Sequence, residues 1–307
     1  MRLVTFNQPT TPRFGAIVEG NVIDLVIGCD ELSPHHAHDF PASCLEFLTG
    51  GDEAFATVRE VLKLATANDN LALLRRAGAI YDEASVEFLP PITHPEKIIC
   101  IGQNYSEHIN EMGHKPPAYP LFFAKYANAL TGHRQAIRLP RVSTMVDYEA
   151  ELVVVIGRTG KDIPVDRAFD YVAGYMNFND VSVRDYQRRT SQFLQGKTFD
   201  TSAPTGAALV TKDEISDPHN LSVHLRLNDE TMQLDTTAHF IFNIPTIINY
   251  LSEIMTLKPG DMIATGTPSG VGFARNPQVF LRAGDTVEVE VEGLGVLRNH
   301  VIAYDEA

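Results

Sequence analysis

Four acidic side chains stand on or near one short apolar segment. Asp147, Glu149 and Glu151 alternate along the residues that lead into Leu152–Ile156, and Asp180 follows Glu151 by 29 residues. Because alternate side chains of a strand share a face, the first three are predicted to point the same way. Several carboxylates without a nearby histidine or cysteine pair suit a hard cation such as Mg²⁺ or Mn²⁺, with Ca²⁺ as a further candidate. We predict that Glu149, Glu151 and Asp180 bind the metal.

The acidic residues of this segment have two other interpretations. An acidic strand face in water is one, but the uninterrupted apolar residues after Glu151 predict a strand that is buried close by. A fourth metal ligand at Asp147 is the other, and we prefer a supporting role for this residue beside the three ligands.

A second group of candidates lies between Gly102 and Gly113. His108 and Glu111 are three residues apart, so on a helix they share a face and can touch. A carboxylate beside an imidazole orients the ring and raises its basicity, which prepares it to take a proton from water. Taken alone, this spacing is more often that of an exposed surface pair. The flanking glycines indicate a segment that can move as a lid.

Further polar residues follow Asp180. Arg184 and Gln187 come four and seven residues later and would line the same helix face, where Arg suits a carboxylate and Gln can donate to an oxyanion. An exposed helix face, on which polar residues simply contact water, explains the spacing equally well. Lys197 stands in a Gly-Lys-Thr sequence, but position 191 is Ser where a phosphate-binding loop requires Gly, so a nucleotide is not expected. A lysine at a metal site can instead stabilise an enolate.

Composition limits the classes of partner. The 307 residues carry a net charge of −14, which argues against nucleic acid and against an anionic membrane as the main partner. The three cysteines show no metal-type spacing and cannot all pair within one chain. No apolar stretch is long enough to span a bilayer, and the first residues lack the apolar core of a signal peptide. These observations predict a cytoplasmic protein in a reducing setting.

The elements that must position these residues form two regions. Short strands are expected at 2–6, 14–18 and 22–26, followed by a helix at about 55–66. The proline-rich stretch 88–95 is the best candidate for a linker, so we predict a small N-terminal α/β accessory domain at 1–90 and a catalytic domain at 91–307. Strand signals dominate the second region, and the fold class is α+β. Without regular βαβ alternation, a TIM barrel or Rossmann fold is not expected.

Five segments, in this order, resemble the fumarylacetoacetate hydrolase family. They are Gly-x-Asn-Tyr-x-x-His-x-x-Glu at 102–111, Asp-Tyr-Glu-Ala-Glu-Leu at 147–152, Asn-Asp-Val-Ser-Val-Arg-Asp at 179–185, Gly-Lys-Thr-Phe-Asp-Thr at 196–201 and Gly-Thr-Pro-Ser-Gly-Val-Gly at 266–272. The likeness covers about residues 95–303. The first 70 to 90 residues resemble the accessory region of the longer members of that family.

The resemblance implies a sheet-rich mixed β-roll that forms a homodimer and holds Mg²⁺ or Mn²⁺. It implies a metal site at Glu149, Glu151 and Asp180, and a catalytic His108–Glu111 pair on a lid with Lys197 near the metal. The positions that it implies for substrate binding are Lys125, Arg184, Gln187 and Thr267.

The reaction that the resemblance implies is hydrolysis of a C–C bond in an acylpyruvate, a 2-oxo acid with a second carbonyl group. Decarboxylation of an oxaloacetate-like diacid and isomerisation of a 2-hydroxy-diene diacid are alternatives at the same site. A non-catalytic metal-binding protein on this fold is a further alternative, although His108 and Lys197 are both present. In each enzymatic case the partner is a small 2-oxo acid.

Overall fold

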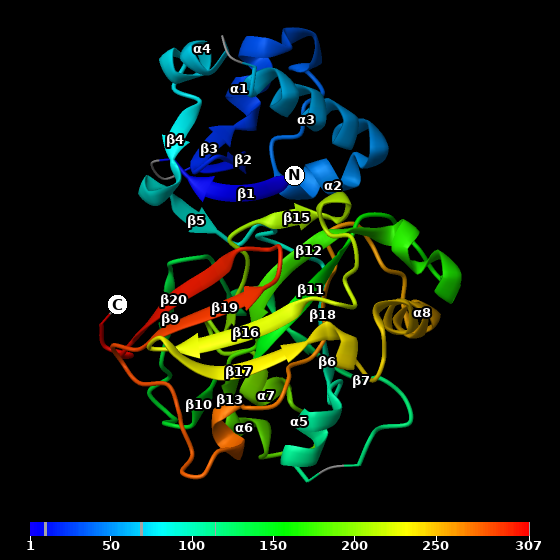
Figure 1. The fold of residues 1–307 in the computed structure, drawn as a ribbon, viewed down its shortest axis with the longest axis vertical. Coiled ribbons are helices and arrows are strands. Elements are labelled where there is room, and N and C mark those ends of the chain that lie inside the picture. Colours follow the sequence, from blue (N-terminus) through cyan, green and yellow to red (C-terminus); the bar gives the residue numbers. More distant parts are fainter. Residues whose placement is uncertain (9–10, 68–69, 114, 307) are drawn as a thin grey trace.

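The computed structural model of the chain describes residues 1–8, 11–67, 70–113 and 115–306. A smaller N-terminal region stands on a larger one that contains most of the strands (Figure 1). The elements of the smaller region are β1 (Arg2–Asn7), β2 (Pro12–Val18), β3 (Asn21–Asp24), α1 (Leu25–Leu32), α2 (Cys44–Thr49), α3 (Gly51–Ala65), α4 (Asn70–Arg76), β4 (Ile80–Asp82) and β5 (Glu87–Leu89).

The larger region is built mainly from strands, with short helices between them. Its strands are β6 (Ile98–Gly102), β7 (Leu121–Lys125), β8 (Leu130–Thr131), β9 (Ala136–Arg138), β10 (Val146–Asp147), β11 (Ala150–Ile156), β12 (Val172–Asn179), β13 (Ser182–Val183), β14 (Ala203–Pro204), β15 (Leu209–Thr211), β16 (Ser222–Leu227), β17 (Glu230–Thr236), β18 (Met262–Ala264), β19 (Thr286–Val291) and β20 (Val296–Ile302). Its α-helices are α5 (Ser106–Glu111), α6 (Arg184–Gln187), α7 (Leu194–Lys197) and α8 (Ile244–Ile254). This content confirms the α+β, sheet-rich class.

One sheet runs through both regions. Its strand order is β4-β3-β2-β1-β15-β12-β11-β18-β6-β7, with β5 paired to β1 on the side. The link between the regions is the antiparallel pairing of β1 with β15, in which Arg2 lies opposite Val210. A second sheet, in the order β17-β16-β19-β20-β9, packs against β11 and β12 of the first sheet. The division at residue 90 remains a prediction, and the backbone hydrogen bonds cross it.

The apolar core also crosses the predicted boundary. One large cluster joins Leu3, Phe14 and Phe47 of the N-terminal region to Val153 and Met262 of the larger one. All five side chains have no exposed surface. A second large cluster lies between the two sheets, and α8 covers its edge. The N-terminal region therefore completes the core on one side of the main sheet.

The predicted end of the third strand is wrong. The sequence indicated a strand at 22–26, but the structure ends β3 at Asp24 and begins α1 at Leu25. The Asp24 carboxylate accepts hydrogen bonds from the N–H groups of Val26 and Ile27, at 3.1 and 3.0 Å. A side-chain acceptor at this position satisfies the first free N–H groups of a helix, so the cap overrides the apolar β-branched pattern.

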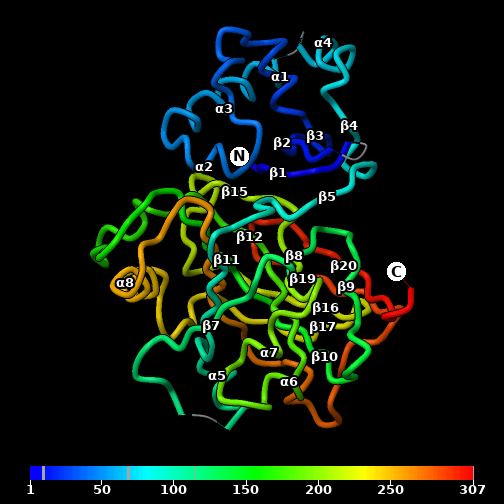
Figure 2. The backbone as a smooth tube through the Cα atoms, turned by 180° about the vertical axis from the view of Figure 1, so that it is seen from behind, coloured from blue at the N-terminus to red at the C-terminus, as the bar shows by residue number. Residues whose placement is uncertain are grey.

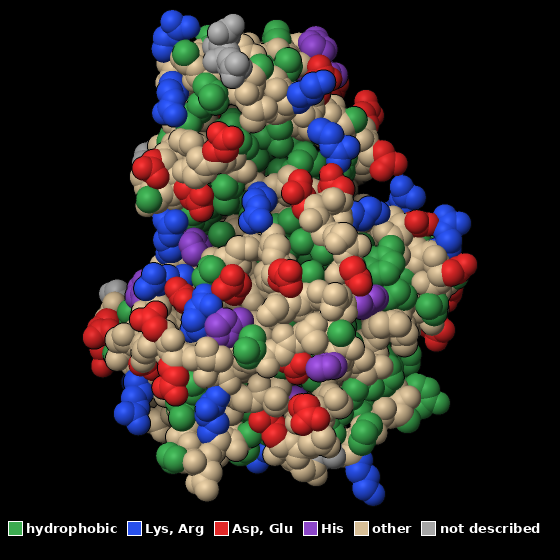
Figure 3. Space-filling model, in the orientation of Figure 1, with side chains coloured by type: hydrophobic (Ala, Val, Ile, Leu, Met, Phe, Trp, Pro, Cys, Tyr) green, Lys and Arg blue, Asp and Glu red, His purple; other side chains and the backbone are tan. Residues whose placement is uncertain are grey.

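The helices α5, α6 and α7 lie at the end of the molecule that points away from the N-terminal region, and Figures 1 and 2 agree on this. On the face drawn in Figure 3, acidic and basic side chains are interspersed. None of the helices among the described residues is long and apolar enough to cross a membrane.

Candidate active site

The pairing of β11 with β12 brings the three predicted metal ligands together. The two strands are antiparallel, and Ala150 lies opposite Asn179. Glu149 is therefore next to Asp180, and the Asp180 N–H donates to the Glu149 carbonyl at 2.9 Å. Glu151 lies two residues after Glu149, on β11. One carboxylate oxygen from each of the three residues lies within 4.8 Å of the others, and all three residues are buried.

Two buried lysines contact this cluster. Lys197 Nζ lies 2.5 Å from Glu149 Oε2 and 2.6 Å from Asp180 Oδ2. Lys125, the last residue of β7, lies 2.7 Å from Asp180 Oδ1. Burial alone would raise the pKa of Glu149, but Lys197 and then Arg184 bring it well below its usual range.

Glu151 has the opposite electrostatic environment. Burial raises its pKa far above the usual range, and the neighbouring Asp180 and Glu149 raise it further. Its compensation among the described residues includes the N–H of Gly266, which donates to Oε2 at 2.9 Å. The cluster thus contains one carboxylate that has no ion pair with a lysine or an arginine of the described residues.

These residues fit a divalent cation. The donor set is three carboxylates, which is the set that Mg²⁺ and Mn²⁺ prefer. A cation among them would relieve the repulsion that raises the pKa of Glu151. Their ligand oxygens are close enough to share one ion. The fit rests on Glu149, Glu151 and Asp180 and does not include Asp147.

Asp147 lies apart from the three carboxylates. The predicted alternation of Asp147 with Glu149 and Glu151 is wrong, because β10 ends at Asp147 and β11 begins only at Ala150. The Asp147 carboxylate instead pairs with Arg184 at 2.7 Å and accepts the N–H groups of Gly272 and Phe273. It holds Arg184 in place, and this contact supplies the supporting role.

The predicted helix face after Asp180 is also wrong in its details. Val146–Asp147 pair with Ser182–Val183 as β10 and β13, so α6 begins only at Arg184. The short strand nevertheless keeps Arg184 beside Asp180. Arg184 Nη1 lies 2.8 Å from a Glu149 oxygen and donates to Gln187 at 3.1 Å. Arg184 Nε donates to Asp147 Oδ2 at 2.8 Å, and Nη2 lies 2.7 Å from the same oxygen.

The lid candidate is a helix whose two predicted catalytic residues contact each other. His108 and Glu111 both lie on α5, and His108 Nδ1 is 2.8 Å from Glu111 Oε1. With the Nδ1 proton directed at this carboxylate, Nε2 is the lone-pair nitrogen. His108 lines the pocket described below. Glu111 also accepts the N–H of Gly270, at 2.9 Å to Oε2, which fastens α5 to the glycine-rich loop 266–272.

Thr267 is held by a residue that the motifs did not single out. Gln233 of β17 is 1% exposed, and its amide nitrogen donates to Thr267 Oγ1 and to the Pro268 carbonyl, both at 2.8 Å. Its amide oxygen accepts the N–H of Ala150 at 2.9 Å. A buried glutamine in a strand was the available signal, but it is visible only once burial is known.

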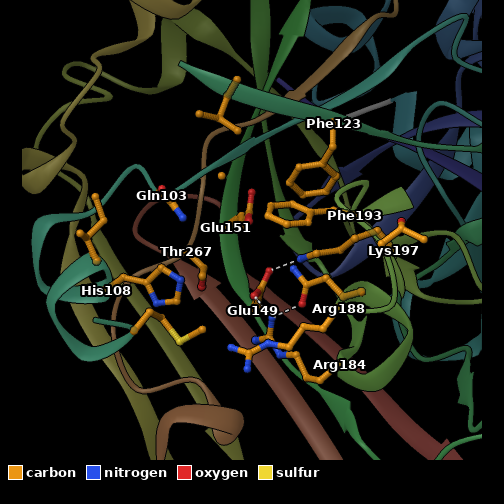
Figure 4. A pocket seen from close by; sticks show the side chains of 16 residues that line it. Gln103, His108, Phe123, Glu149, Glu151, Arg184, Arg188, Phe193, Lys197 and Thr267 are labelled. Atoms are coloured by element: carbon orange, nitrogen blue, oxygen red, sulfur yellow. Dashed lines mark hydrogen bonds and ion pairs between the residues drawn. The ribbon is translucent and has the colours of Figure 1, made fainter. Parts of the chain in front are cut away.

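Most of the predicted residues line one cavity of about 440 Å³. In Figure 4, His108 and Thr267 lie on one side of Glu149 and Glu151, and Lys197 lies on the other. Gln187 and Arg184 also line the cavity, whereas three predicted residues, Glu111, Lys125 and Asp180, are not among the residues that line it. The lining also includes residues that were not predicted as site residues, among them Gln103, Phe123, Arg188 and Phe193.

Comparisons with known proteins agree with the motifs. The model of the fumarylacetoacetate (FAA) hydrolase C-terminal family matches residues 97–302. An oxaloacetate tautomerase of Xenopus laevis, named fahd2 and mitochondrial, is 42% identical over 98% of this chain and 90% of its own length. The mitochondrial oxaloacetate tautomerase FAHD2A of Bos taurus is 43% identical over 98% of this chain and 92% of its own length.

Solved structures of similar proteins cover the whole fold. The fumarylacetoacetate hydrolase of Exiguobacterium antarcticum has a TM-score of 0.81 and 32% identity over 99% of both chains. A 2-hydroxyhepta-2,4-diene-1,7-dioate isomerase of Mycobacterium marinum has a TM-score of 0.74 and 30% identity over 100% of both chains. The maleylpyruvate hydrolase of Sphingobium sp. SYK-6, in complex with manganese(II) and pyruvate, has a TM-score of 0.77 and 27% identity over 99% of both chains.

The predicted cytoplasmic location is contradicted, because the Xenopus laevis and Bos taurus relatives are named as mitochondrial proteins. In this chain Cys29, Cys44 and Cys100 are buried and free. Free buried thiols require only that no disulfide forms, a condition that does not single out the cytoplasm. The free cysteines therefore do not identify the cellular compartment of the protein.

The matches share two features with the cavity described above. They span the strands that carry the carboxylates and the helix that carries His108, and they extend over almost the whole chain. The family model alone covers two thirds of the sequence. The chain belongs to the fumarylacetoacetate hydrolase family.

Proposed function

We propose that this chain is a metal-dependent enzyme that interconverts the keto and enol forms of an oxaloacetate-like 2-oxo acid. The observation that carries the proposal is the His108–Glu111 pair: His108 lines the same cavity as Lys197 and as Glu149 and Glu151, two members of the cluster of three buried carboxylates. Tautomerisation moves one proton between carbon and oxygen, so it needs a single acid–base group and stabilisation of an enolate. The named activity of the 42–43% identical relatives supports this choice.

Glu149, Glu151 and Asp180 would hold the metal, with Mg²⁺ or Mn²⁺ favoured and Ca²⁺ as a further candidate. When bound, the cation supplies Lewis-acid polarisation of the 2-oxo group and orients the substrate. A manganese(II) ion in the maleylpyruvate hydrolase neighbour supports this donor set.

The other residues of the site transfer the proton, stabilise the negative charge and bind the substrate. His108 Nε2 takes the proton from the carbon next to the 2-oxo group and returns it to oxygen, while Glu111 fixes the ring. Lys197 stabilises the negative charge that develops on the oxygen. Arg184, Gln187 and Thr267 bind the substrate from the cavity wall, and Lys125 pairs with Asp180.

Hydrolysis of an acylpyruvate is the second candidate. The same enolate is its leaving group, and His108 would instead activate the water that attacks the distal carbonyl. The maleylpyruvate hydrolase neighbour supports it, and a cavity of about 440 Å³ has room for a substrate longer than a four-carbon acid. Decarboxylation of oxaloacetate and isomerisation of a 2-hydroxy-diene diacid, the activity named for the Mycobacterium marinum neighbour, use this enolate chemistry too.

The test is an assay of the purified chain with Mg²⁺ or Mn²⁺. The enol of oxaloacetate is followed by its ultraviolet absorbance, and pyruvate and CO₂ are measured separately with oxaloacetate and with acylpyruvates. We expect accelerated loss of the enol without CO₂ release. Pyruvate formation from acylpyruvates alone would favour the second candidate, and no reaction in any assay would leave a metal-binding protein.

The His108→Gln variant tests the mechanism. We expect turnover to fall by about 10²–10⁴ with Mn²⁺ affinity unchanged, because one acid–base group contributes about that factor and His108 is not a ligand. The matched control is His94→Gln, since His94 contacts only Thr93 among the hydrogen-bond partners described. Unchanged turnover in His108→Gln would exclude His108 as the acid–base group.

We also propose the homodimer that the resemblance implies. Analytical ultracentrifugation of the purified chain tests it, and a monomer would contradict the proposal.

A further inference from the structure

Arg188 is a cation of the cavity that the mechanism above does not use. It follows α6 directly and lines the cavity beside Arg184. In Figure 4 the two arginines lie on the same side of Glu149. Arg184 is balanced by Asp147 and Glu149, whereas Arg188 forms no ion pair with a carboxylate of the described residues.

The guanidinium of Arg188 is positioned by an aromatic ring. It lies 4.0 Å from the centroid of Phe273, in the range of a cation–π contact. Phe273 is itself fixed, because its N–H donates to Asp147 at 2.9 Å. A stacked guanidinium keeps its N–H donors free at the edge of its plane. Arg188 is therefore held in place without using the donors that bind a carboxylate.

The charged residues that line the cavity are more often basic than acidic. Among the charged residues that line it, Arg184, Arg188 and Lys197 outnumber Glu149 and Glu151. A divalent cation at the carboxylates would increase the positive excess. The proximity of Arg184 lowers the pKa of Arg188, after the larger effect of burial, which reflects the same excess. A substrate with two negative charges matches this lining better than a substrate with one.

We propose that Arg188 binds the second carboxylate of the substrate and so makes the enzyme selective for dicarboxylic 2-oxo acids. This inference rests on the proposed function, because it takes the first carboxylate and the 2-oxo group to lie at the metal end of the cavity. Arg188 forms charge-assisted hydrogen bonds to the distal carboxylate while Phe273 supports its guanidinium from behind. Arg188 is thus a specificity-determining residue and takes no part in proton transfer.

The experiment compares two substrates in four proteins. Oxaloacetate carries the second carboxylate, and acetylpyruvate has an uncharged methyl ketone in its place. The ratio of their kcat/KM values is measured for the wild type, Arg188→Gln, Arg188→Lys and Arg189→Gln. Arg189 is the matched control, because it is the next residue, stacks on Tyr186 and pairs with Asp185 at 3.8 Å. It does not line the cavity.

We expect Arg188→Gln to lower the ratio by about ten- to a hundredfold, the effect of losing one charge-assisted contact. The change should appear mainly in KM for oxaloacetate. Arg188→Lys should recover part of the ratio, and Arg189→Gln should retain it. An equal loss for both substrates, or no change in the ratio, would overturn the proposal while the proposed function stands.

A binding measurement covers the case in which the wild type turns over neither substrate, which would contradict the proposed function. Calorimetric titration in Mg²⁺ then compares 2-oxoglutarate, a dianion, with 2-oxobutyrate, a monoanion. Tighter binding of the dianion that Arg188→Gln abolishes and Arg189→Gln retains would support the role of Arg188. Equal binding of the two acids in the wild type would contradict it.

Discussion

The four buried carboxylates of the site are not equivalent, and their partners decide their roles. Asp147, Glu149 and Asp180 each contact a buried lysine or arginine within 2.8 Å. Glu151 does not, and its pKa is raised by burial and by the charges of Asp180 and Glu149. In the absence of metal, the ionised Glu151 therefore destabilises the folded protein. We infer that its role is to bind a ligand.

The first prediction concerns Glu151→Gln. The metal-free variant should be at least as stable as the wild type at pH 7, because the repulsion is removed and the amide oxygen can still accept the Gly266 N–H. Its Mn²⁺ affinity should fall by more than about a hundredfold, since loss of a ligand should exceed the 10- to 100-fold cost of losing a supporting contact. Thermal unfolding and calorimetric titration measure the two effects.

Glu149→Gln is the matched comparison. It should also lose Mn²⁺ affinity, but it should destabilise the metal-free protein by about 3–5 kcal/mol, because Lys197 and Arg184 lose a buried partner. If Glu151→Gln kept the affinity of the wild type, Glu151 would not be a ligand.

The second prediction concerns Gln233, which connects β17 to the glycine-rich loop 266–272. Gln233→Ala should lower the free energy of unfolding by about 1–3 kcal/mol, because the Ala150 N–H and Pro268 carbonyl lose their buried partner. The released Thr267 should raise KM. Urea unfolding and steady-state kinetics check both effects. The exposed Gln278→Ala is the control, with an expected change below about 0.5 kcal/mol.

At the residue scale, the sequence was informative wherever chemistry imposes a residue type. Glu149, Glu151 and Asp180 were found from charge beside an apolar strand, and the structure brings them together. Gln233 and Arg188 were not found, because their roles depend on which distant segment each one faces. Gln233 acts on residues that are 34 and 83 positions away in the chain.

At the scale of elements, α5 and the loop 266–272 act together. Glu111 binds both His108 and the Gly270 N–H, so one carboxylate contacts the imidazole and holds α5 against this loop. The third prediction is that Glu111→Ala increases hydrogen–deuterium exchange in residues 106–111 by at least about tenfold and lowers kcat. Glu107→Ala is the control, since Glu107 is exposed on the same helix. Equal exchange in both variants would mean that packing alone holds the lid.

The fourth prediction concerns the connection between β8 and β9, where His133 is 8% exposed. Burial, and then Arg134 and Arg298, lower its pKa from 6.5 to about 4. The unfolded chain therefore binds more protons than the folded chain between pH 6.5 and 4, and the stability contributed by neutral His133 is lost as the pH falls through that range. The loss should reach about 2–3 kcal/mol near pH 4.5.

Urea unfolding at pH 7.5 and 4.5 measures this loss. Other groups also titrate in this range, so the quantity of interest is the difference between the wild type and His133→Gln. Because the variant has no imidazole, its stability should fall less with pH, by about the stated amount. Parallel pH profiles for the two proteins would show that His133 is protonated without cost.

The sequence located the elements better than their ends. The helix at His108 and the strand at Leu152–Ile156 lie where periodicity and apolar runs placed them. The ends at Asp24 and Arg184 were missed, because a capping carboxylate and a two-residue strand pairing with a segment about 36 residues away decide them. Such long-range pairing leaves no local pattern.

At the scale of the whole molecule, the two regions share both a sheet and a core, which the predicted domain boundary did not anticipate. β1 pairs with β15, and Phe14 and Phe47 share a cluster with Val153 and Met262. A linker rich in prolines indicates a change of direction, and it carries no information about whether the segments on either side pack together. The N-terminal region therefore packs against the strands whose ends carry the three carboxylates Glu149, Glu151 and Asp180.

The fifth prediction follows from this shared core. The intact chain should unfold in one calorimetric transition, and Phe14→Ala should lower the free energy of unfolding by about 3–5 kcal/mol and shift that whole transition. Because β11 contributes to the same cluster, the temperature at which Mn²⁺ affinity is lost should move with it. The exposed Tyr304→Ala is the control. Two resolved transitions, with only the first moved by Phe14→Ala, would mean that the regions fold separately and that the boundary at residue 90 is a true domain boundary.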